Sequence, residues 1–95
     1  MTGNSGLNNH HTDTLAAIHA HPTSHNIRWV DAVSLIGAVG DVEEKHDGRF
    51  RFTIGTQSQV FDRPHGKDLD VQQVVDLRHM LQAAGYGPPS RTRED

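Results

Sequence analysis

The 95-residue sequence contains no cysteine, which excludes disulfide bonds and metal sites built on thiolates. Aromatic residues are scarce at 5%, and hydrophobic residues make up 34% of the chain, so any core is small. No apolar run approaches the roughly 18 residues that a membrane span requires. The polar start, residues 1–6, lacks the basic and apolar regions of a signal peptide. We therefore expect one small cytoplasmic domain without a membrane segment.

The chain also lacks an excess of positive charge. It carries 9 Lys and Arg against 12 Asp and Glu, a formal net charge of −3 at pH 7. Proteins that bind nucleic acid non-specifically are usually basic over the whole domain. The composition therefore argues against that class, although it leaves room for a local basic face.

Histidine is the residue in excess, with eight in the chain. Zinc needs three or four converging ligands, whereas His19 and His21 are two positions apart and would point in different directions on a helix. A metal site is therefore the weaker alternative. We expect a flexible, histidine-rich interaction segment, with no metal and no cofactor. Five histidines precede residue 26: His10, His11, His19, His21 and His25.

Two segments have the apolar periodicity of amphipathic helices. The first covers residues 29–39, and Trp29 opens its apolar stripe. We expect this indole to anchor the core rather than to stack on nucleic-acid bases. The second helix follows a capping aspartate, Asp68 or Asp70, and ends at Gly85.

A shorter helix is expected nearer the N-terminus. Thr12 or Asp13 can cap it, and it runs to Ala20, because the residue before Pro22 is pushed out of the helical region. Residues 1–11 have no visible period, which predicts a disordered arm.

Three strands are predicted between the two long helices. The first starts at Val42, and the third covers residues 57–63, before Pro64, which lacks an amide donor. The second strand alternates strictly, which predicts one buried face and one basic outer face. Its inward residues are Phe50, Phe52 and Ile54, and its outward residues are Arg49, Arg51 and Thr53.

This order predicts an α+β fold, in which two helices pack on one face of a three-stranded antiparallel sheet, α-β-β-β-α, with a short extra N-terminal helix. The expected organisation has four parts. Residues 1–11 are a disordered arm and residues 12–26 an N-terminal extension. Residues 27–87 form the domain, and residues 88–95 are a disordered tail.

The junction between the third strand and the last helix reads Pro64-His65, then Lys67-Asp68-Leu69. Two further segments fit the same pattern: residues 31–40, a helix with its stop at Gly40, and residues 80–86, the end of the last helix. Together, this arrangement resembles the HicA family of bacterial toxin–antitoxin toxins. The resemblance covers about residues 28–86. It implies a fold like that of double-stranded-RNA-binding domains (dsRBD-like). It also implies an endoribonuclease that acts on messenger RNA and is neutralised by a HicB-like antitoxin.

The resemblance also identifies candidate catalytic residues. The family's catalytic histidine lies at the start of the second strand, where this chain has Arg49. Metal-free RNA cleavage needs a group that moves a proton near neutral pH, and arginine stays charged, although it can stabilise a phosphate. His46 and His65 are the alternative proton-transfer groups. We therefore take His65, Arg49 and His46 as the catalytic candidates.

A phosphate-binding patch is the matching RNA-binding hypothesis, and we expect Arg49, His65 and Lys67 to converge at one edge of the open sheet face. The alternatives are a solvated strand face, with Asp62 or Asp68 pairing the cations, and a structural His65 that bonds the last helix or a strand. The alternative function is a non-catalytic module that keeps the fold and binds protein or RNA. The RNA-binding candidates are Arg49, Arg51, Arg63 and Lys67.

Overall fold

A computed structural model describes residues 9–23 and 26–88 of the chain. In chain order the elements are α1 (Asn9–Ile18), α2 (Trp29–Val39), β1 (Asp41–Glu44), a 3-10 turn (His46–Gly48), β2 (Arg49–Ile54), β3 (Gln57–Asp62) and α3 (Val71–Ala83). The strands form one antiparallel sheet in the order β1-β2-β3. The predicted α+β fold is therefore confirmed.

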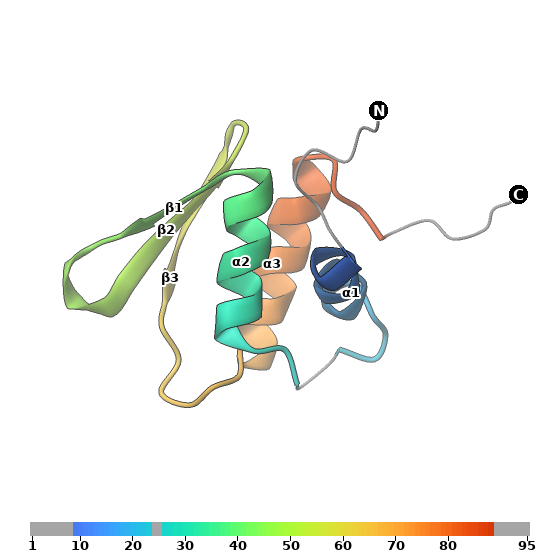
Figure 1. Ribbon diagram of the computed structural model, residues 1–95, viewed down its shortest axis with the longest axis horizontal. Helices are drawn as coiled ribbons and strands as arrows, with labels where there is room; N and C mark the ends of the chain where they lie inside the picture. Colours follow the sequence, from blue (N-terminus) through green and yellow to red (C-terminus); the bar gives the residue numbers. More distant parts are fainter. Residues whose placement is uncertain (1–8, 24–25, 89–95) are drawn as a thin grey trace, which may run out of the picture.

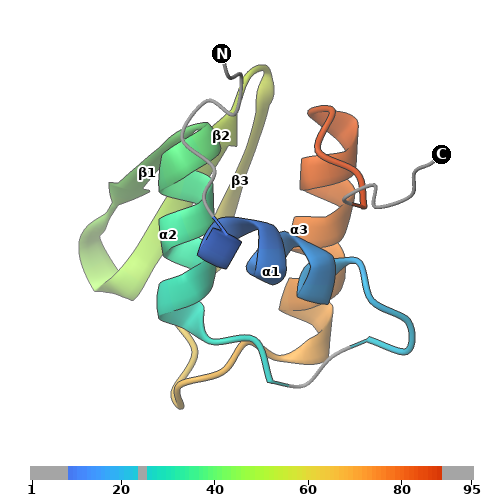
Figure 2. The ribbon, with the colours of Figure 1, turned by 45° about the vertical axis from the view of Figure 1, so that its right-hand side comes forward.

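The elements form three layers (Figure 1). Helices α2 and α3 cover one face of the sheet, α2 against β1 and β2 and α3 against β3. Helix α1 crosses the side of this helix pair that faces away from the sheet (Figure 2). Leu15 and Ile18 of α1 belong to the same hydrophobic core as the rest of the domain.

An aromatic stack joins α2 to the sheet. Phe52 is fully buried, with ring centroids 5.6 Å from Trp29 and 4.9 Å from Phe61. The Trp29 ring also meets the edge of Phe50, at 5.2 Å. Trp29 is therefore the core anchor that its position at the head of the stripe predicts.

The strand alternation is as predicted for most positions. Phe52 and Ile54 face the helices and are buried, while Arg49 and Arg51 are exposed. Phe50, which was also predicted to be buried, is only half-buried, because it lies at the start of the strand. The facing of β3, which the sequence left open, is settled by Phe61, because this residue is buried opposite Phe50.

Glycine allows α2 to end close against the sheet. A Cβ atom on Gly40 would overlap the carbonyl oxygen of Thr53. The chain therefore passes from α2 into β1 at a distance from β2 that other residues do not permit.

The N-terminus of α3 is capped by Asp70, one of the two predicted aspartates. Asp70 Oδ1 accepts from the Gln73 amide at 2.8 Å, and the Gln73 side chain accepts from the Asp70 amide at 3.2 Å. This reciprocal pair is a capping box. Helix α3 is followed by Gly85 in the left-handed region, with φ 96°, as the sequence predicts.

The predicted bounds of the first helix were wrong. Helix α1 begins at Asn9 and ends at Ile18, so residues 9–11 are helical rather than part of an arm. The first turn of α1 is stabilised because His11 is buried and contacts Ser34 of α2. Sequence analysis does not predict this contact, because histidine is a polar residue type. The remainder of the predicted arm and most of the predicted tail, residues 1–8 and 89–95, lie outside the described residues. Across the described ranges, no helix has the length and apolar character needed to cross a membrane.

Candidate functional site

The segment before α3 runs alongside the segment before α2. The Trp29 amide donates to the Lys67 carbonyl, and the Leu69 amide donates to the Ile27 carbonyl, each at 2.8 Å. Arg28 and Asp68 form an isolated antiparallel bridge between these bonds. The two helices therefore begin at the same end of the molecule, where the loop from β3 to α3 also lies (Figure 1).

The alternation of buried and exposed residues explains this arrangement. Ile27 and Leu69 are buried in the core, whereas Arg28 and Asp68, their immediate neighbours in the chain, are exposed. Extended chain places successive side chains on opposite sides, so burial of the two apolar residues directs Arg28 and Asp68 outward. Lys67 is exposed as well, and its carbonyl accepts from the Trp29 amide.

A hollow of about 310 Å³ opens at this end of the molecule. Three of its lining residues are cationic and exposed, and they come from both segments. Gly66 adds no side chain that would fill the space. We call this site the cationic hollow, and its lining residues are Arg28, Trp29, Val30, Arg63, Gly66 and Lys67.

Among the described residues, the cations of the hollow have no acidic partner. Within residues 9–23 and 26–88, Arg28, Arg63 and Lys67 form no ion pair with a carboxylate. Asp68 lies opposite Arg28 in the bridge but forms no ion pair with it. Arg28 is also the N-cap residue of α2 and makes no side-chain capping bond, so the positive end of the helix adds to the local potential.

On the open sheet face, by contrast, the arginines are paired with carboxylates. Arg49 Nε lies 3.8 Å from Asp62 Oδ1, and Arg51 Nη1 lies 3.8 Å from Glu43 Oε1. Asp41 adds a further carboxylate, opposite Thr53 on the same face. The outer face of β2 therefore carries the predicted arginines, but each has an acidic neighbour. This agrees with the alternative of a solvated strand face on which carboxylates pair with the cations.

The catalytic candidates occupy three different surroundings. His46 lies in the turn after β1 and lines a second hollow with Glu43 and Glu44. Arg49 is paired with Asp62. His65 is exposed and makes no hydrogen bond or ion pair in the part of the chain that the structure describes. The structural alternative for His65, a bond to the start of α3 or to a strand, is thus not seen.

The strand ends on which the predicted meeting of Arg49, His65 and Lys67 rested lie side by side, because the Arg63 amide donates to the Gly48 carbonyl at 3.2 Å. Lys67 lines the cationic hollow, whereas Arg49 and His65 are not among its lining residues. Arg28 lines the hollow in their place, and no motif of the sequence pointed to this residue.

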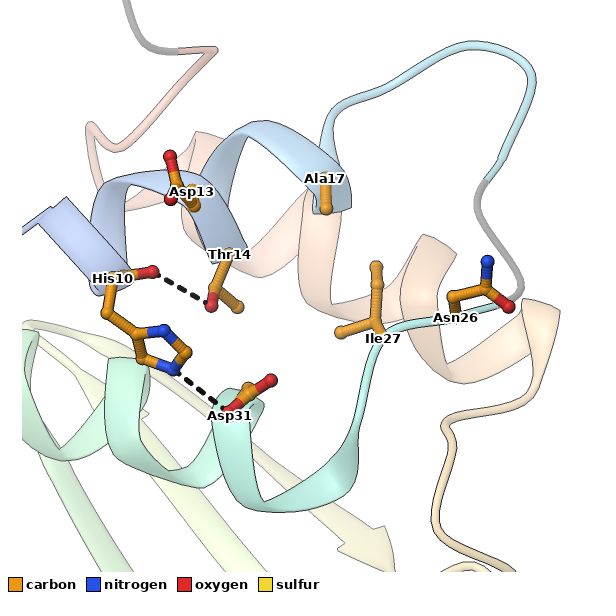
Figure 3. Close-up of a pocket in the computed structure, with 7 residues that line it drawn as sticks. All are labelled: His10, Asp13, Thr14, Ala17, Asn26, Ile27 and Asp31. Carbon is orange, nitrogen blue, oxygen red and sulfur yellow. Dashed lines mark hydrogen bonds and ion pairs between the residues drawn. The ribbon is translucent and has the colours of Figure 1, made fainter.

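Three of the five N-terminal histidines make structural contacts instead of forming a free arm, and His25 lies outside the described residues. His11 and His19 are buried, with Nε2 atoms 2.9 Å from Ser34 Oγ and 3.0 Å from the Tyr86 carbonyl oxygen. His10 Nε2 lies 2.9 Å from Asp31 Oδ1, at the edge of a hollow of about 250 Å³ between α1 and α2 (Figure 3). Among the described residues, no three potential metal ligands gather.

Arg78 on α3 is a further contact that the sequence did not indicate. Its guanidinium donates to the carbonyl oxygens of Ile18 and Ala20 at 3.0 and 3.3 Å, and to Thr23 Oγ1 at 3.1 Å. These bonds satisfy carbonyl groups at the C-terminal end of α1, which a helix leaves without partners. Arg78 therefore fastens α1 and is not part of the cationic hollow.

No protein-family model, curated protein or solved structure matches this chain. The resemblance to the HicA family therefore stays a prediction from the motifs of the sequence. The features that bear on function are the cationic hollow, the paired arginines of the sheet face and the exposed His65.

Proposed function

We propose that the protein is a HicA-like RNA-binding protein that contacts RNA through the cationic hollow. The supporting observation is that Arg28, Arg63 and Lys67 line one hollow without carboxylate partners among the described residues. Guanidinium and ammonium groups are the side chains that bind phosphate oxygens most strongly. Three such groups suit a few phosphates, which agrees with a chain that has no overall basic excess.

The toxin part of the proposal follows from the resemblance. A HicA-like protein would act on messenger RNA in the cytoplasm and be neutralised by a HicB-like antitoxin. His65 is the best-placed group for proton transfer, since it lies between Arg63 and Lys67 in the chain and is exposed. Its imidazole would be near an RNA phosphate held by those two residues.

A non-catalytic RNA-binding module is the second candidate function. It is favoured by the replacement of the expected histidine with Arg49, whose guanidinium is paired with Asp62. No histidine is among the residues that line the cationic hollow. In this case the domain binds RNA and leaves it intact.

Binding of a fluorescently labelled single-stranded RNA, followed by anisotropy over a range of salt concentrations, tests the proposal. Affinity should fall with salt, with a logarithmic slope of about −2 for three neutralised phosphates. Lys67→Gln and Arg63→Gln should each weaken binding and make the slope shallower by about 0.7. Arg51→Gln is the matched control, because this exposed arginine already faces Glu43 and should change little.

Two outcomes of the binding test count against the proposal. One is an absence of binding at low salt. The other is an equal loss in Arg51→Gln and Lys67→Gln, which would move the RNA to the sheet face. Incubation of RNA with wild type, His65→Ala and Arg49→His then separates the two candidate functions. Cleavage lost in His65→Ala with binding kept supports the nuclease, and RNA left intact by the wild-type protein supports the module.

A further inference from the structure

We infer that the cationic hollow recognises a terminal phosphate monoester, at the end of an RNA chain, rather than the internal phosphodiester backbone. This inference rests on the proposed RNA binding and names the part of the RNA that the hollow takes. An internal diester carries one negative charge. A monoester carries about −1.5 to −2 at neutral pH and offers three strong acceptor oxygens. Arg28, Arg63 and Lys67 match the charge of the second group better than that of the first.

One carboxylate borders the hollow and opposes a backbone that continues on that side. Asp68 directly follows Lys67 in the chain, lies opposite Arg28 in the bridge, and is exposed. A strand that passed through the hollow on this side would bring its next phosphate towards this carboxylate. Like charges repel, so the arrangement penalises a through-running backbone and favours a chain that ends in the hollow.

The size and the wall of the hollow also suit the end of a chain. Its volume of about 310 Å³ is at the lower limit of ligand pockets, which span roughly 300–1000 Å³. Val30 is 61% exposed and supplies an apolar wall beside the three cations. A terminal nucleotide can place its phosphate on the cations and its sugar or base on Val30. Trp29 is buried and cannot stack on a base.

The test compares three versions of one short single-stranded RNA with the full-length protein. The versions carry a 5′ phosphate, a 3′ phosphate or hydroxyl groups at both ends, and each has the fluorophore on an internal base. We expect one of the phosphorylated versions to bind about tenfold more tightly than the hydroxyl version, which is the effect of one additional charge-assisted hydrogen bond. The end that gives the gain identifies the orientation of the RNA.

Matched variants connect the gain to the hollow. Lys67→Gln and Arg63→Gln should remove most of the preference for a phosphorylated end, whereas Arg51→Gln should keep it. Asp68→Asn should increase the affinity for all three RNAs, because it removes a repulsive charge beside the path of the backbone. The fold-increase should be largest for the hydroxyl version. The side chains of these residues are exposed, so thermal unfolding should confirm that every variant is folded.

The outcomes distinguish RNA binding by the hollow from recognition of a terminal phosphate. Equal affinity for the three RNAs, with equal weakening by Lys67→Gln, overturns the terminal-phosphate inference and leaves RNA binding by the hollow intact. No binding of any version at low salt overturns both. A preference for a phosphorylated end that survives both Lys67→Gln and Arg63→Gln would show that the terminal group binds elsewhere, which also overturns the inference.

Discussion

Replacement of Phe52 by alanine tests the aromatic stack that joins α2 to the sheet. The ring is fully buried between Trp29 and Phe61. Loss of a buried phenylalanine ring lowers the free energy of unfolding by about 3–5 kcal/mol, through lost burial and the cavity that remains. Each aromatic pair contributes about 0.5–1.5 kcal/mol beyond burial. We therefore expect a loss near 5 kcal/mol.

Such a loss is large for a domain of this size. At about 0.05–0.15 kcal/mol per residue, a chain of 95 residues has a free energy of unfolding of about 5–14 kcal/mol. Phe52→Ala would therefore leave a marginally folded protein. Phe52→Leu keeps most of the apolar volume and loses the ring contacts, so we expect a loss of about 1–2 kcal/mol and a protein that can be measured.

Urea denaturation, followed by circular dichroism and by the fluorescence of the single tryptophan, Trp29, measures both variants. Val60→Ala is the control on the same sheet, because this side chain is 45% exposed on the opposite face. It should change the free energy of unfolding by no more than about 0.5 kcal/mol. A loss below about 1 kcal/mol in Phe52→Ala, or one equal to that of the control, would refute the packing of α2 on the sheet.

Two further predictions concern the helix contacts. His11→Ala should lower the free energy of unfolding by about 0.5–1.5 kcal/mol, because it removes a buried side chain and its hydrogen bond to Ser34. His21→Ala, at an exposed position, should have no measurable effect in the same urea titration, and equal effects would contradict the docking of α1. Asp70→Ala should cost about 1 kcal/mol by removing the cap of α3, whereas Asp70→Asn should restore most of it. An equal loss of stability in both variants would mean that the Asp70 side chain does not stabilise α3 through its capping hydrogen bond.

The long helices and the strands were predictable because their signals are local. The apolar stripe of residues 29–39 gave the bounds of α2. The alternation around Phe52 gave the buried face of β2, and the turn at His46–Gly48 separated it from β1. Each of these patterns records which side of one element meets the core, so no knowledge of the partner element is needed.

The start of the N-terminal helix could not be predicted in the same way. His11 is buried by Ser34, which lies 23 residues away, and His19 by the carbonyl of Tyr86, 67 residues away. A histidine reads as polar when only the sequence is considered, and each of these two bonds a partner that is distant in the chain. The sequence thus suggested an arm at positions that belong to the packed face of α1.

The sequence indicated most of the charged residues of the candidate site, but it did not indicate which of them lie together. Arg63 and Lys67 stand out at a strand–helix junction. The pairing of Arg51 with Glu43 depends on the register between β1 and β2, and this register brings a carboxylate to the expected basic face. Arg28 reaches the hollow only because its segment pairs with the one around Asp68.

Burial of Leu69 therefore has a role in the candidate site as well as in the core. Leu69 is 3% exposed, and its amide bonds the Ile27 carbonyl, which aligns Lys67 with Arg28. Leu69→Ala should lower the free energy of unfolding by about 2–5 kcal/mol. It should also weaken RNA binding by the molecules that stay folded, because the two segments lose their alignment.

Lys67→Gln separates these two effects, since it should weaken RNA binding without a change in stability. Binding titrations at a low temperature, at which circular dichroism shows Leu69→Ala to be folded, give the affinity of the native state alone. If that affinity equals that of the wild type, the hollow does not depend on the bridge between Arg28 and Asp68. If it falls, burial of an apolar side chain in the core is what holds three separated cations around one ligand.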